Sequence, residues 1–229
     1  MRLKLTVLGG VIAVGLLAFT AVAIGGGKAP SAHMNMNMMN MGAAQTKVTA
    51  SDLRVKLDNL LGRHAVLAMN ATNEGVTGSK AFSSTATALD RNSVALSQAI
   101  ASVYGKKAGN TFLNGKFMWR AHIGFFVDYT KALATKNADA QAKAVANLKR
   151  YTVVFGDFLA KATNLPKLAV RSDLAAHVFQ LKGQLDAYAD GRYAEASKLY
   201  GQAYDHMFMT GDLLAKAIVR QYPQKFPKS

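Results

Sequence analysis

The chain has 229 residues, no cysteine and a formal net charge of +15 at pH 7. The lack of cysteine excludes disulfide bonds, thiolate zinc sites and cysteine nucleophiles, so any soft-metal chemistry must use methionine and histidine. The basic residues are scattered singly or in pairs and are not interleaved with aromatic residues, so we do not expect a nucleic-acid partner. The positive charge suits a protein that lies against an anionic membrane surface or an anionic cell wall.

Residues 1–26 have the pattern of an export signal. Arg2 and Lys4 precede an apolar run from Leu5 to Ile24, and Ala21-Val22-Ala23 offers a small-x-small cleavage site. The run is also about 20 residues long, which is enough to span a bilayer, so an uncleaved N-terminal anchor is the alternative. In both cases we expect the rest of the chain to be secreted or anchored at the outer face of the cytoplasmic membrane.

Residues 27–50 form a predicted flexible linker that contains a methionine-rich tract. Five of the ten methionines of the chain lie within eight residues of one another, directly after a histidine. The candidate ligands in this tract are His33, Met34, Met36, Met38, Met39 and Met41. Thioether sulfur is a soft ligand that suits Cu(I), so the tract predicts copper binding. The alternative is a methionine- and asparagine-rich linker without a metal.

From residue 51 onward, apolar residues recur at helical spacing, and a single proline interrupts them before residue 221. We expect Ser51-Asp52 to cap the first helix, and glycine or proline to end the others. The predicted helices cover about residues 51–75, 79–104, 108–135, 138–163, 167–189 and 193–221. Because the connections are short, neighbouring helices should be antiparallel. The sequence therefore predicts one all-α domain over residues 51–229, an up-down antiparallel bundle of six helices.

The last four predicted helices contain a repeated pattern. His122 and His177 are 55 residues apart, and the same offset aligns residues 156–162 (GDFLAKA) with residues 211–217 (GDLLAKA). His64 lies 58 residues before His122. These offsets predict a bundle built from three helical-hairpin repeats. The glycine that opens each aligned segment should mark a close helix crossing, since glycine within a helix otherwise costs about 1 kcal/mol.

Four histidines and two methionines in the predicted helices are candidate ligands for a second, buried copper site. They are His64, Met118, His122, His177, His206 and Met209. Met118 lies four residues before His122 and Met209 three residues after His206, so each pair shares a helix face. The hypothesis places His122, His177 and His206 around one ion, with both methionines nearby. The alternative is a set of structural histidines, with methionine as adaptable core filler.

Other site chemistries fit the sequence less well. A carboxylate-bridged di-iron bundle needs glutamates on several helices, and the chain has only Glu74 and Glu195. No serine-nucleophile elbow, P-loop or dinucleotide-binding fingerprint occurs. Two bundle histidines could hold a non-covalent haem, but nothing in their spacing favours haem over copper. We therefore do not expect an enzyme.

Residues 60–226 resemble a group of exported all-helical proteins of Gram-positive bacilli that are commonly labelled copper amine oxidase-like. The segments that carry the resemblance are Leu60–His64, Leu89–Asn92, Ala101–Gly105, Trp119–Thr130 and His206–Gly211. The resemblance implies export and a link to copper. It does not imply the oxidase reaction, because that enzyme needs a modifiable tyrosine in an Asn-Tyr-Asp/Glu motif and no Asn-Tyr pair occurs in this chain.

The sequence therefore favours an exported copper-binding protein that captures, stores or delivers copper through methionine and histidine, without catalysis. The alternative is a basic helical bundle that adheres to the cell envelope or binds a partner protein without a metal. The sequence does not predict an oligomeric state.

Overall fold

The structure, a computed structural model, describes residues 48–226, so the predicted export signal, the linker and the methionine-rich tract lie outside the described residues. The helices are α1 (Ala50–Thr77), α2 (Phe82–Tyr104), α3 (Lys106–Asn114), α4 (Trp119–Ala134), α5 (Ala138–Thr163), α6 (Lys167–Ala189) and α7 (Tyr193–Gln221), followed by a short 3-10 helix, η1 (Pro223–Lys225). No strand occurs between residues 48 and 226. The predicted all-α fold is confirmed. None of the helices in this range is both long enough and apolar enough to cross a membrane.

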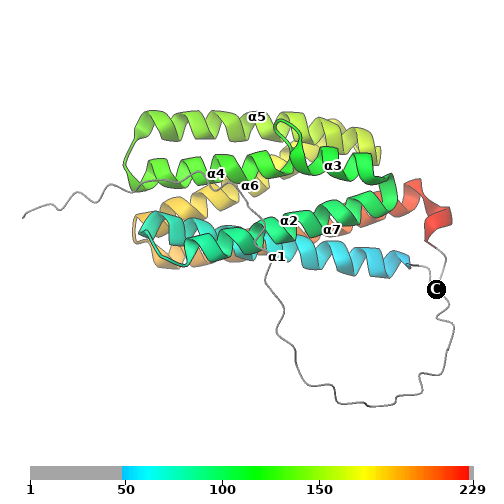
Figure 1. The fold of residues 1–229 in the computed structure, drawn as a ribbon, viewed down its shortest axis with the longest axis horizontal. Coiled ribbons are helices and arrows are strands. Elements are labelled where there is room, and N and C mark those ends of the chain that lie inside the picture. The colour runs from blue at the N-terminus through cyan, green and yellow to red at the C-terminus, as the bar shows by residue number, and fades with distance from the viewer. Residues whose placement is uncertain (1–47, 227–229) are drawn as a thin grey trace, which may run out of the picture. The chain divides into compact units, whose positions relative to one another are not determined.

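The chain crosses the bundle six times, in alternating directions, as predicted. Figure 1 shows that α3 and α4 follow one another in the same direction and together make the third crossing. Helix α1 is central, because it packs against α2, α4, α6 and α7. Helix α7 packs against α1, α5 and α6 and does not contact α4. This difference decides which histidines meet in the core.

The third predicted helix is interrupted at residues 115–118. Helix α3 ends at Asn114 with Gly115 as its C-cap, and Phe117 has a φ of 57°, a left-handed conformation that a continuous helix does not contain. Such a conformation costs about 1–2 kcal/mol for a residue other than glycine. The bend nevertheless buries Phe117 and Trp119 in the core, and this burial offsets the backbone cost. Asn114-Gly115 is a helix-stop signal, but the apolar pattern continues on both sides of it, so the sequence predicted one continuous helix.

Helix α1 begins slightly earlier than predicted. Its cap is Thr49, not Ser51-Asp52: the Thr49 hydroxyl accepts a hydrogen bond from the Asp52 backbone N–H at 3.1 Å. In return, the Asp52 carboxylate accepts from the Thr49 backbone N–H at 2.8 Å. This capping box satisfies two backbone donors that a helix end otherwise leaves unpaired.

Gly156 and Gly211 lie at close helix crossings, as predicted. A Cβ atom on Gly156 would lie 3.3 Å from Cα of Arg171 on α6. A Cβ atom on Gly211 would lie 3.2 Å from both Cα and N of Asp58 on α1. At each crossing the backbones approach so closely that a side chain would displace the neighbouring helix.

The aspartate that follows each of these glycines pairs with an arginine of the neighbouring helix. Asp157 accepts from Nη2 of Arg171 at 2.7 Å, and Asp212 accepts from Nη2 of Arg54 at 3.1 Å. The two aligned segments therefore make equivalent contacts with different partners. A shared origin of the hairpins in a repeat remains a prediction.

Replacing Gly211 with alanine should destabilise the protein by about 1–3 kcal/mol, because the new methyl group would clash with the Asp58 carboxylate and press against the α1 backbone. Gly201→Ala is the matched control, since Gly201 lies in the same helix and has nothing within 4 Å of its added Cβ. Alanine there should stabilise the helix by up to about 1 kcal/mol. Urea denaturation of both variants measures the difference, and equal effects would contradict the close crossing.

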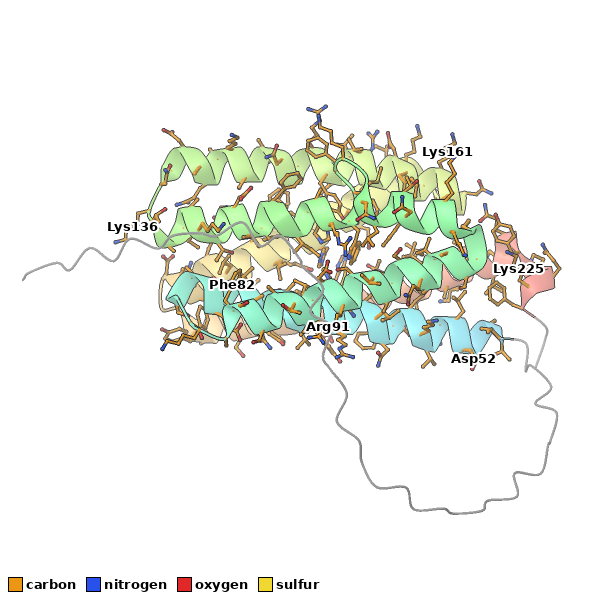
Figure 2. The ribbon with its side chains drawn as sticks, in the orientation of Figure 1. Asp52, Phe82, Arg91, Lys136, Lys161 and Lys225 are labelled. Atoms are coloured by element: carbon orange, nitrogen blue, oxygen red, sulfur yellow. The ribbon has the colours of Figure 1, made fainter. Side chains whose placement is uncertain are left out.

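Charged side chains lie on the outside of the bundle. Arg91, Lys136 and Lys161 are exposed on the surface of the bundle (Figure 2), and the ammonium group of Lys225 lies against the Val103 carbonyl of α2. No lysine, arginine, aspartate or glutamate between residues 48 and 226 is buried, whereas all four histidines in this range are. The histidines are therefore the exception to a core that otherwise excludes basic side chains.

Candidate metal centre

Three histidines from three helices converge in the core. His64 of α1, His122 of α4 and His177 of α6 are each between 1% and 3% exposed, and we refer to them as the histidine triad. One nitrogen of each ring lies within 4.8 Å of the corresponding nitrogens of the other two. The ring of His64 lies 5.4 Å from that of His122 and 5.8 Å from that of His177, measured between centroids. Between residues 48 and 226, no other three His, Asp or Glu side chains come together in this way.

The spacing of the triad is close to that of a mononuclear metal site. An ion at the centre of three atoms that lie within 4.8 Å of one another would be at most about 2.8 Å from each, whereas a metal–histidine bond is about 2.0–2.1 Å long. Each ring would therefore need to move by no more than about 0.7 Å to bind an ion at the centre. Three protein ligands also leave a fourth tetrahedral position free.

Most of the triad nitrogens lack a hydrogen-bond partner. Both ring nitrogens of His64, both of His177 and Nδ1 of His122 are buried and unpaired. An unsatisfied buried polar group costs about 1–3 kcal/mol, so native proteins seldom leave five of them together. A bound ion would satisfy one nitrogen of each ring.

Aromatic side chains enclose the triad. The ring of Trp119 lies 4.6 Å from that of His64 and 4.9 Å from that of His122. Tyr151 stacks on His122 at 4.6 Å with an interplanar angle of 18°. Two cavities flank the triad, one of about 110 Å³ beside His177 and one of about 40 Å³ beside His64 and His122. The surroundings of the triad are therefore mainly apolar.

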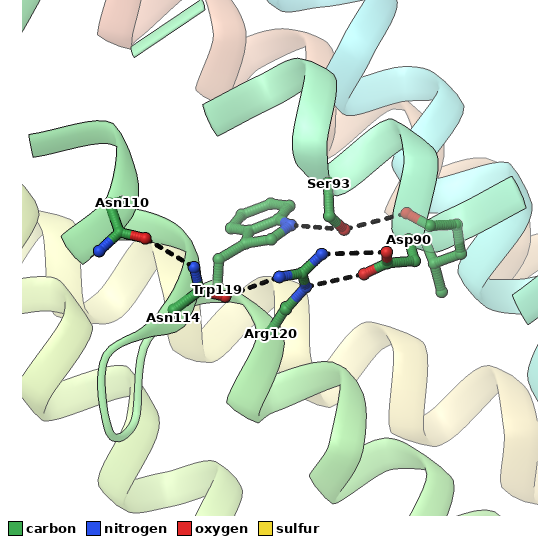
Figure 3. Close-up of polar contacts among 7 residues, drawn as sticks. Asp90, Ser93, Asn110, Asn114, Trp119 and Arg120 are labelled. Atoms are coloured by element: carbon green, nitrogen blue, oxygen red, sulfur yellow. Dashed lines mark hydrogen bonds and ion pairs between the residues drawn. The ribbon is translucent and has the colours of Figure 1, made fainter. Parts of the chain in front are cut away.

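Polar contacts fix Trp119 at the first residue of α4 (Figure 3). Its Nε1 donates to Oγ of Ser93 on α2 at 3.1 Å. The next residue, Arg120, donates to both carboxylate oxygens of Asp90, from Nε at 2.8 Å and from Nη2 at 3.0 Å. A third bond runs from Nη1 of Arg120 to Oδ1 of Asn114 at 2.7 Å. These bonds tie the start of α4 to α2 and α3, and so hold the triad histidine that follows one turn later.

Burial keeps the triad neutral. It lowers the pKa of His122 to about 3, with a smaller contribution from His177. It likewise lowers the pKa of His177 to about 3, with smaller contributions from His64 and His206. The pKa of His64 falls well below its usual value because of burial and the neighbouring His122. A neutral imidazole is the form that binds a metal, so no triad proton has to be removed at neutral pH.

The fourth predicted histidine lies beside the triad and not within it. His206 of α7 is 8% exposed, and its ring centroid lies 6.4 Å from that of His177. The hypothesis that grouped His122, His177 and His206 therefore needs a correction, because the structure brings His64 to that position. The reason is that α1 packs against both α4 and α6, whereas α7 does not contact α4.

The two predicted methionine ligands of the domain differ in burial. Met118 is partly buried at the N-cap of α4, and Met209 is 62% exposed, so the expectation that Met209 lies within the buried site is wrong. Helical spacing places Met209 beside His206 on α7, but it does not show which of the two side chains the neighbouring helices bury. Sequence reasoning missed Met207, which is buried and lines the larger cavity together with His177.

Sequence reasoning also missed the role of Trp119 as a wall of the site. The sequence signal for this role was the position of Trp119, which lies three residues before His122 and hence on the same helix face. The tract ligands from His33 to Met41 lie outside the described residues.

Comparison of the chain with protein-family models, with curated proteins and with solved structures finds no match. The function therefore has to be inferred from the residues of the site.

Proposed function

We propose that the protein is an exported copper-binding protein whose histidine triad holds one copper ion in the core of the bundle. The observation that carries this proposal is the convergence of three buried histidines with five unpaired ring nitrogens. Such a group destabilises a core unless something binds to it. An ion bound by His64, His122 and His177 would connect α1, α4 and α6.

Copper is the favoured ion for two reasons. Imidazole suits zinc, copper, iron and nickel, and among divalent ions of the first transition series copper binds such ligands most tightly. The methionine-rich tract adds thioethers, which suit Cu(I). In this proposal the tract captures copper outside the cytoplasmic membrane, where the signal-like residues 1–26 would direct the chain, and the triad retains the ion.

The surroundings of the triad suit retention better than catalysis. The larger cavity beside it is lined almost entirely by apolar and aromatic side chains, with no carboxylate among them. General acid–base catalysis needs a titratable group within hydrogen-bond reach of the reacting atom. We therefore propose storage or delivery of copper, and no reaction.

A copper titration tests the proposal, because Trp119 is the only tryptophan of the chain and lies in ring contact with two triad histidines. The titration uses the full chain with the tract methionines replaced by leucine and His33 by alanine, which we call the tract variant. One equivalent of Cu(II) should bind tightly and quench most of the tryptophan emission. His122→Leu in the tract variant should abolish both effects, and Zn(II) should compete without quenching, since it has a filled d shell.

The unaltered chain should bind further copper at the tract, as Cu(I), in competition with a chromogenic chelator. Leucine keeps the bulk of methionine but lacks the sulfur, so the tract variant should lose this additional binding. Absence of binding and of quenching in the tract variant would overturn the triad as a copper site. The basic envelope bundle without a metal would then be the better account of the chain.

A further inference from the structure

His206 and Asp173 form a second pair of candidate ligands outside the triad. The side chain of His206 is 10% exposed, and its Nε2 lies 3.2 Å from Oδ1 of Asp173 on α6. The two atoms do not make a hydrogen bond, so the buried Nε2 is unpaired. The Thr210 hydroxyl lies 3.1 Å from the other carboxylate oxygen of Asp173 and also 3.1 Å from the His206 backbone carbonyl, so it can donate to either.

The separation of these two atoms suits a shared metal ion. Two ligand atoms 3.2 Å apart, each about 2.1 Å from an ion, subtend an angle of about 100° at that ion, close to the tetrahedral value of about 109°. Imidazole nitrogen and carboxylate oxygen are both ligands of Zn(II), and imidazole also suits copper. His206 and Asp173 can therefore bind one ion together without a change of backbone.

The pair lies between the solvent and the triad. Side-chain exposure decreases from 25% at Asp173 to 10% at His206, and the triad histidines are almost fully buried. The ring of His206 lies 6.4 Å from that of His177, at an interplanar angle of 29°. An ion that leaves the outer pair toward the core would therefore meet the imidazole of His177 first.

Two features of α7 and α6 assist capture at the outer pair. Met209 follows His206 by three residues and is 62% exposed, so its thioether is accessible to an ion in solvent. The carboxylate of Asp173 also attracts cations locally on a chain whose net charge is +15 and otherwise repels them.

We propose that His206 and Asp173 form an outer metal site through which copper reaches the histidine triad by ligand exchange. This inference rests on the proposed function, since the triad is the destination of the ion. No bond other than metal–ligand bonds forms or breaks, and the oxidation state of the ion does not change. Replacing either ligand should slow loading of the triad without preventing it.

Stopped-flow quenching of Trp119 by Cu(II) in the tract variant measures the loading rate. His206→Leu and Asp173→Asn should each slow quenching about tenfold or more, within the range by which local charge and ligands change association rates. The final extent of quenching should stay unchanged. Asp205→Asn is the matched control, because Asp205 is exposed beside His206 and carries the same charge, and this change should leave the rate within about twofold.

A second measurement detects the outer site itself. Once the triad is filled, the tract variant should bind a second, weaker equivalent of Cu(II), which His206→Leu and Asp173→Asn should both lose and Asp205→Asn should keep. Unchanged rates together with a retained second equivalent would overturn the outer site while leaving the triad intact. An equal slowing by Asp205→Asn would show general charge attraction and would also overturn it. Failure of the tract variant to show any quenching would overturn the proposed function together with this inference.

Discussion

The metal-free protein should lose at least about 4 kcal/mol of stability when the pH falls from 7 to 5. An unfolded histidine has a pKa of about 6.5 and gains a proton over this range. The folded triad stays neutral, because the pKa values of His122 and His177 are about 3 and that of His64 is well below the usual value. The unfolded state therefore binds more protons, and His122 and His177 each contribute about 2 kcal/mol of the loss, with a further loss from His64.

The sign of this effect follows from the direction of the pKa changes. Stability contributed by the neutral triad is complete above pH 6.5, begins to fall as the pH drops below that value, and continues to fall until the pH nears 3. Urea denaturation of the metal-free tract variant at pH 7, 6 and 5 measures it. His64→Leu should reduce the loss, since one titrating group of three is removed. An unchanged pH dependence in this variant would contradict the burial of a neutral His64.

Much of the fold could be predicted from the sequence because the helix boundaries carry local signals. Helices α5 and α7 span the predicted residues, and α6 begins at Lys167 directly after Pro166. The Asn137 side chain caps α5 by accepting from the Ala140 backbone N–H at 2.9 Å. Such signals act within a few residues of the chain, so no knowledge of the tertiary structure is needed to read them.

The interruption between α3 and α4 could not be predicted in the same way. The apolar pattern continues through residues 115–118, and only the packed core shows that Phe117 is better buried through a bend. The choice of histidines that form the candidate site could not be predicted from local patterns either. Helical spacing placed each histidine on an apolar face, but membership of the triad depends on which helices are neighbours. Which helices are neighbours is a property of the whole bundle, and this arrangement places His64 in the triad and His206 beside it.

Copper should stabilise the tract variant by about 2.7 kcal/mol at a free concentration one hundred times the Kd, and by about 4.1 kcal/mol at one thousand times the Kd. The physical reason is that the triad exists only in the folded state, where His64, His122 and His177 come together. For a domain of this size, 1 kcal/mol corresponds to about 2–4 °C, so the melting temperature should rise by about 5–11 °C at the lower concentration. Thermal unfolding followed by circular dichroism measures the rise.

Leucine substitutions in the triad distinguish a metal site from a set of structural histidines. His64→Leu, His122→Leu and His177→Leu should each remove most of the copper-dependent rise. Without copper at pH 7 they should leave the stability unchanged or increase it, because each removes unpaired buried nitrogens and keeps the side-chain bulk. His206→Leu is the matched control within the same core, and it should retain most of the rise because it lies outside the triad. Structural histidines would give the opposite pattern: a loss of stability without copper and no effect on the response to copper.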